Sequence, residues 1–67
     1  MTEVLDSDFE WHDGKLVHMP TGAVFTPGSD WVNWGRAGEV LDDGREYDMG
    51  ELLSAALRMI FAAARKG

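Results

Sequence analysis

The sequence predicts a small α+β fold in which an antiparallel β-meander of three or more strands packs against one C-terminal α-helix. Two observations predict it. The dipeptide Asp13-Gly14 separates two alternating segments, which is typical of a β-hairpin. The segment from Met49 to Arg65 is rich in strong helix formers, and Asp48 precedes it as a cap. A chain of 67 residues suffices for a single domain, with mostly strands and loops over residues 1–47 and a helix over 48–66.

The first hairpin is expected to join residues 9–12 to residues 15–19 through a two-residue type I′ turn. This turn fixes the register, and four pairs then lie opposite each other: His12 and Lys15, Trp11 and Leu16, Glu10 and Val17, Phe9 and His18. Because side chains alternate along a strand, one side of the hairpin faces the core. That side carries Phe9, Trp11, Leu16 and His18.

Two further segments follow the hairpin. Pro20-Thr21-Gly22 predicts a turn into a short third strand over residues 23–26, which ends at Pro27-Gly28-Ser29. Residues 30–38 contain two tryptophans three positions apart and two glycines. This pattern fits neither a regular strand nor a stable helix, so the segment is predicted to be a loop or a helical turn.

A second Asp-Gly dipeptide, Asp43-Gly44, lies between two short segments that contain Val40 and Tyr47. It predicts a second, shorter hairpin. With a two-residue turn at this dipeptide, Val40 faces Tyr47.

The C-terminal helix is expected to be apolar over more of its surface than one sheet covers. Apolar residues fill an arc of about 200° on a helical wheel, whereas a single core contact needs a stripe of about 100°. They are Met49, Leu52, Leu53, Leu57, Met59, Ile60, Phe61, Ala63 and Ala64. Two outcomes account for the excess: two copies associate through this helix, or Leu57 or Phe61 packs against residues 31–38.

The net charge of −6 is unevenly distributed along the chain. Residues 1–48 carry eleven acidic side chains against three basic ones, whereas residues 49–67 carry a net charge of +2. Such a surface repels phosphate backbones, so direct nucleic-acid binding is not expected and a basic protein surface is the favoured partner. The alternative is that the charge only keeps a small domain soluble.

Six acidic residues and two tryptophans are the candidates for contact with such a partner. They are Asp6, Asp8, Glu10, Trp31, Trp34, Asp42, Asp43 and Glu46. If the first strand extends back through Leu5, the first three form an acidic stripe on the face opposite the core, with His12 at its end. The second hairpin supplies the other acidic residues. The tryptophans are included because this residue type is enriched at binding hot spots, the alternative being that both belong to the core.

In its profile, which is short, acidic and free of cysteine, the chain resembles phage-encoded inhibitors such as anti-CRISPR proteins and other DNA mimics. These bind a basic groove on a larger protein and keep nucleic acid out of it. The resemblance covers composition and no signature residues. It implies a non-enzymatic binding protein that acts as an inhibitor or nucleic-acid mimic. The alternative is a structural or assembly module that homodimerises through its apolar helix, with the acidity serving only solubility.

Catalysis, metal binding and a cofactor are not expected. The chain has no cysteine, and its three serines lie in no nucleophile motif. His12 and His18 are expected to point to opposite faces of the hairpin, so they do not converge on a metal. The longest nearly apolar stretch, residues 52–64, is too short to span a bilayer, and the acidic N-terminus resembles no export signal. A cytoplasmic location is therefore expected, without a membrane partner.

Overall fold

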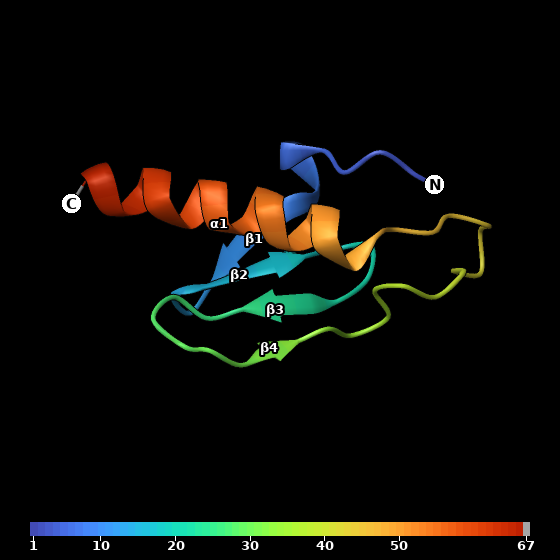
Figure 1. The fold of residues 1–67 in the computed structure, drawn as a ribbon, viewed down its shortest axis with the longest axis horizontal. Helices are drawn as coiled ribbons and strands as arrows, with labels where there is room; N and C mark the ends of the chain where they lie inside the picture. The colour runs from blue at the N-terminus through green and yellow to red at the C-terminus, as the bar shows by residue number, and fades with distance from the viewer. Residues whose placement is uncertain (67) are drawn as a thin grey trace.

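The computed structural model describes residues 1–66 and confirms the predicted fold class (Figure 1). Its elements are a short 3-10 helix η1 (Asp6–Asp8), strands β1 (Phe9–His12), β2 (Lys15–His18), β3 (Ala23–Phe25) and β4 (Val32–Asn33), and the helix α1 (Met49–Lys66). The four strands form one antiparallel sheet in the order β1-β2-β3-β4, so each strand pairs with its neighbour in the chain. The helix runs along this sheet (Figure 1), in a molecule that measures 38 × 20 × 19 Å.

The first hairpin has the predicted register, with Phe9 opposite His18 and His12 opposite Lys15. Both turn residues have positive φ angles, 51° at Asp13 and 75° at Gly14. These angles are those of the type I′ turn, whose twist matches that of the two strands. The local sequence therefore determines this part of the fold.

The core lies between the sheet and the first half of α1. Its buried apolar residues are Phe9, Leu16, Ala23, Phe25, Ala37, Leu41, Tyr47, Leu52, Ala55 and Ala56. Three of the four residues predicted to face the core from the hairpin are buried, namely Phe9, Leu16 and His18. The prediction is wrong for Trp11, whose exposed fraction is 45%. It lies on an edge strand and borders a shallow depression with Met59, Ala62 and Ala63, where the small alanine side chains leave part of the indole uncovered.

Residues 30–38 are not only a loop or helical turn, because Val32–Asn33 forms the edge strand β4. A strand of two residues is too short to produce a recognisable alternation in the sequence. The chain then turns at Gly35, where φ is +57° and an added Cβ would lie 2.5 Å from the carbonyl oxygen of Thr21. Only glycine fits at this position.

The second hairpin differs from its predicted register, because Val40 pairs with Glu46 and not with Tyr47. The N–H of Leu41 donates to the carbonyl of Arg45 at 2.7 Å, which encloses a three-residue loop. Within that loop an oxygen of the Asp43 side chain accepts the N–H of Arg45 at 3.1 Å. This local hydrogen bond favours the wider loop over the two-residue turn that an Asp-Gly dipeptide otherwise forms.

The helix begins as predicted, with Asp48 as its N-cap. The N–H of Glu51 donates to the Asp48 side chain at 2.9 Å, which satisfies one of the free donors at the helix start. Along α1 the buried residues are Leu52, Ala55 and Ala56, whereas residues 61–65 are all exposed. The first half of the helix therefore packs on the sheet, and its last turns extend beyond the strand ends (Figure 1).

Two leucines of α1 test this division of the helix. Leu52 is fully buried, and Leu57 is 42% exposed. Leu52→Ala is expected to lower the free energy of unfolding by about 2–5 kcal/mol because it opens a cavity in the core. Leu57→Ala is the matched control and should cost about 1 kcal/mol or less. Urea unfolding followed by circular dichroism measures both, and equal losses would show that the core is misplaced.

Candidate interaction surface

An apolar groove lies between the middle of α1 and the segment that leads into β4. Its volume is about 460 Å³, and its apolar walls include Trp31, Trp34, Leu53, Leu57 and Ile60. We call this surface the tryptophan groove. Leu57 thus lies beside the tryptophan segment, which was one of the two outcomes predicted for the apolar excess of the helix.

The two tryptophans of the groove have different roles. The ring of Trp34 meets that of Phe25 edge to face, with centroids 5.8 Å apart, so it is anchored against the core. Trp31 is 71% exposed. Its backbone N–H donates to the hydroxyl of Ser29 at 3.1 Å, which orders the turn that presents it. The alternative that both tryptophans belong to the core is therefore right only for Trp34, which packs against the core, and wrong for Trp31.

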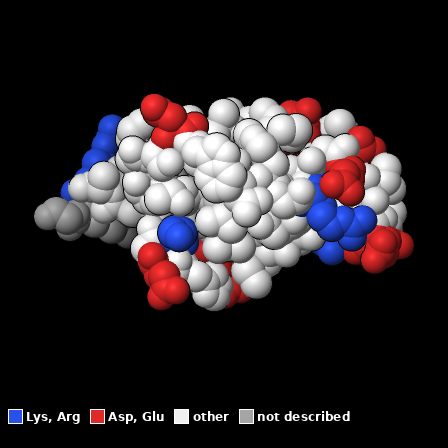
Figure 2. Space-filling view, turned by 90° about the horizontal axis from the view of Figure 1, so that it is seen from below, with Lys and Arg blue, Asp and Glu red and all other residues white. Residues whose placement is uncertain are grey.

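The helix continues this surface with a strip of apolar residues. Leu53, Leu57, Ile60 and Ala64 follow the spacing i, i+4, i+7 and i+11, which places them on one side of the helix. Phe61 lies one turn beyond Leu57 and is 64% exposed. Figure 2, which views the molecule from the β4 side, shows charged residues towards the two ends and an uncharged centre.

The predicted acidic stripe does not form. Asp6 and Asp8 lie in η1 instead of an extended strand, because the N–H of Asp8 turns back to the carbonyl of Leu5 at 3.0 Å. An oxygen of Asp6 accepts a hydrogen bond from Arg58 of α1 at 2.9 Å, so this side chain is directed to the helix. Of the predicted row, Glu10 keeps its place on β1, where it lies 3.4 Å from His12.

The acidic residues of the second hairpin do not join those of the first. Arg45 lies 2.6 Å from Asp43, and Arg36 lies 3.7 Å from Asp42. The backbone N–H of Arg45 donates to Asp43 and, together with the Arg45 guanidinium, lowers the pKa of this carboxyl. Glu46 pairs through its backbone with Thr2 near the N-terminus. The six predicted acidic residues are therefore spread over several surfaces.

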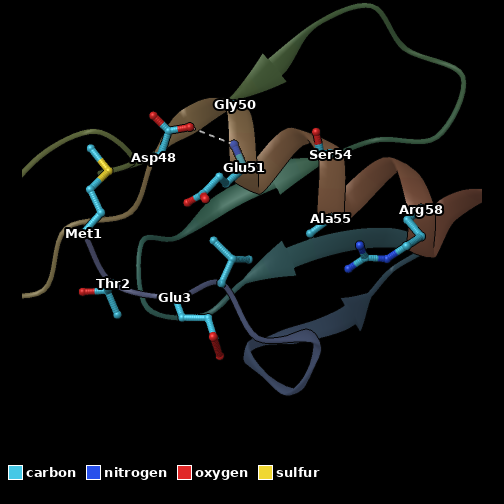
Figure 3. A pocket seen from close by; sticks show the side chains of 10 residues that line it. Met1, Thr2, Glu3, Asp48, Gly50, Glu51, Ser54, Ala55 and Arg58 are labelled. Carbon is cyan, nitrogen blue, oxygen red and sulfur yellow. Dashed lines mark hydrogen bonds between the residues drawn. The ribbon is translucent and has the colours of Figure 1, made fainter.

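A different acidic depression lies between the N-terminal segment and the first turns of α1 (Figure 3). Its volume is about 610 Å³, and Glu3, Asp48 and Glu51 line it together with Arg58. Sequence reasoning missed Glu3 and Glu51 as candidates. The hydrogen bonds between Thr2 and Glu46, which are 44 residues apart, place the N-terminal segment here, and no local pattern reports such a contact.

His18 is the buried polar residue of most chemical interest, and its surroundings disfavour its charged form. Its Nδ1 shares a hydrogen bond of 2.8 Å with the hydroxyl of Thr21, while Nε2 has no partner in the described part of the chain. Burial lowers the pKa of His18; the nearby Asp8 opposes this shift, and Arg45 adds to it. Among residues 1–66 no cluster of three or more histidine or carboxylate side chains is arranged to hold a metal ion.

Protein-family models, curated proteins and solved structures were compared with the chain, and none of them matches it. Within the described residues, no helix has both the length and the apolar character needed to cross a membrane.

The buried His18 makes the stability of the fold depend on pH. Its pKa in the folded state lies below the ordinary value of 6.5, so the unfolded chain binds more protons near this pH. The free energy of unfolding should therefore be constant above about pH 7 and fall below about pH 6.5, by at most about 1.4 kcal/mol per pH unit.

Urea unfolding between pH 5 and pH 7.5 measures this dependence. The variant His12→Gln leaves His18 as the only histidine and should keep the same slope. A slope that disappears in this variant would assign the effect to His12 and contradict the prediction.

Proposed function

We propose that this protein is a non-enzymatic interaction module that binds another polypeptide through the tryptophan groove and the adjoining Phe61. The observation that supports this proposal is the exposure of large apolar side chains from two separate elements around one groove. Trp31 is 71% exposed, Phe61 64% and Leu57 42%. If a fully exposed large side chain has about 200 Å² of surface, these three side chains together present roughly 350 Å² of apolar surface. This area lies within the range of functional patches on monomeric proteins.

The chemistry of the groove supports binding over catalysis. Its one ionisable side chain among the described residues is Asp30, and Ser29 is already bonded to the backbone of Trp31. General acid–base catalysis needs a group that donates a proton and a group that accepts one within reach of the same substrate. The tryptophan groove offers no such pair among the described residues, whereas it offers aromatic surface of the kind that anchors protein interfaces.

The acidic depression favours a second candidate function, the recognition of a basic protein surface. Glu3, Asp48 and Glu51 line it, while Arg58 is drawn towards Asp6. A partner that normally binds nucleic acid has the complementary charge, so the protein would act on it as an inhibitor. This candidate also accounts for the net charge of −6, which the apolar groove does not.

Affinity capture from cells tests the first proposal. Phe61→Lys is expected to reduce capture of the binding partner at least tenfold, because a charge placed in a desolvated interface is costly. Met19→Lys makes the same kind of change at a half-exposed methionine after β2 and is the control that should retain capture. Equal capture by both variants would refute binding through the groove.

Charge reversal at two places separates the second candidate from the first. The pair Glu3→Lys and Glu51→Lys inverts the acidic depression, and the pair Asp42→Lys and Glu46→Lys inverts the second hairpin. If the acidic depression recognises a basic surface, the Glu3 and Glu51 pair should weaken capture strongly and the Asp42 and Glu46 pair should not, and capture by the parent should fall between about 50 and about 500 mM salt, where exposed charges are screened. Capture that resists both pairs and salt would exclude acidic recognition.

A further inference from the structure

We infer that the polypeptide bound by the tryptophan groove is a second copy of this chain, and that two copies associate with their α1 helices antiparallel. The inference rests on the proposed function, because it names the partner for the same surface. Four features of that surface support it: the spacing of its apolar residues, its shape, its size and its charge.

The spacing suits another helix. From Leu53 to Ala64 the apolar strip spans twelve residues, or about 16 Å along the helix axis. The charged side chains Glu51, Arg58 and Arg65 project from the opposite side of the helix, as expected from their positions relative to the strip. A continuous apolar strip of this length is the surface on which a second helix packs.

The shape is self-complementary. A contact with two-fold symmetry uses the same patch on both copies, so the patch must contain both a projection and a hollow. Phe61 projects from α1, and Leu57, one turn before it, lines the groove. A two-fold axis that crosses the helix near Leu57 brings Phe61 of each copy against the groove of the other.

The size of the patch matches the need of a stable dimer. A standard interface buries about 800 Å² on each partner, of which a little over half, or about 450 Å², is apolar. The exposed parts of Trp31, Leu57 and Phe61 supply roughly 350 Å². The half-buried side chains of Trp34, Leu53 and Ile60 border the same groove and add to this area.

The charge favours this face over the rest of the surface. Two copies that each carry −6 repel one another, yet residues 49–67 carry +2, so the helix is where they approach with the least repulsion. The antiparallel arrangement is favoured because it opposes the dipoles of the two helices.

Sedimentation equilibrium of the full chain, from about 1 μM to 1 mM, tests the inference with two matched alanine variants. Ala64 belongs to the apolar strip, whereas Ala62 borders the depression at Trp11; both are exposed on α1. Ala64→Lys is expected to weaken dimerisation at least tenfold, and Ala62→Lys should dimerise like the parent. Because lysine has a high helix propensity, circular dichroism should show both variants folded.

Three other results would overturn the inference. A parent that stays monomeric at 1 mM excludes a second copy as the occupant, and a dimer that survives Ala64→Lys excludes the strip. A dimer lost only in Ala62→Lys would place the contact at Trp11. A parent that stays monomeric but captures another polypeptide, in a way that Phe61→Lys abolishes, keeps the proposed function with a different partner, whereas a parent that neither dimerises nor captures a polypeptide loses both.

Discussion

The hydrogen bond between His18 and Thr21 lies inside the fold where β2, β3 and the turn after β4 meet. The Thr21 hydroxyl also accepts the N–H of Ala23 at 3.2 Å, and its carbonyl accepts the N–H of Arg36 at 2.8 Å, which links β2, β3 and the turn after β4. The His18 ring packs between Phe9 and Tyr47, with centroid distances of 4.9 and 4.7 Å. The polar pair thus sits beside aromatic rings, and its burial lowers the pKa of His18.

The length of α1 relative to the strands explains why a surface remains for binding. A helix of 18 residues is about 27 Å long, whereas a strand of four residues spans about 13 Å. The sheet can therefore cover only about half of the helix. Leu52, Ala55 and Ala56 of the first half are buried in the core. The strip beside Trp31 lies on a neighbouring side of the same helix, where Leu53 and Ile60 still pack partly against the core and Leu57 is exposed.

Local sequence determined the elements whose stabilising contacts are themselves local, such as the turn at Asp13-Gly14 and the capped helix. The same dipeptide at Asp43-Gly44 gave a different loop, because the Asp43 side chain bonds to Arg45. For the candidate site, the spacing of apolar residues indicated the excess on the helix that includes Leu57, whereas the two tryptophans were chosen for their residue type, and their place beside Leu57 depends on the fold. The acidic surfaces were not predictable, because exposed carboxylates carry no periodic pattern, and contacts between distant segments decide which of them meet.

Apolar burial and exposed charges contribute very different free energies to association. Burial of roughly 350 Å² of apolar surface on one copy contributes about 9 kcal/mol at 25 cal/mol per Å², whereas an exposed ion pair contributes about 0.2–1 kcal/mol. The apolar gain from the two faces of a dimer must still offset an association cost of about 4–15 kcal/mol. The expected contact is therefore reversible, and its affinity depends on the aromatic side chains. Under the proposed function, the acidic surface would disfavour acidic partners, because repulsion between like charges acts before the apolar faces meet.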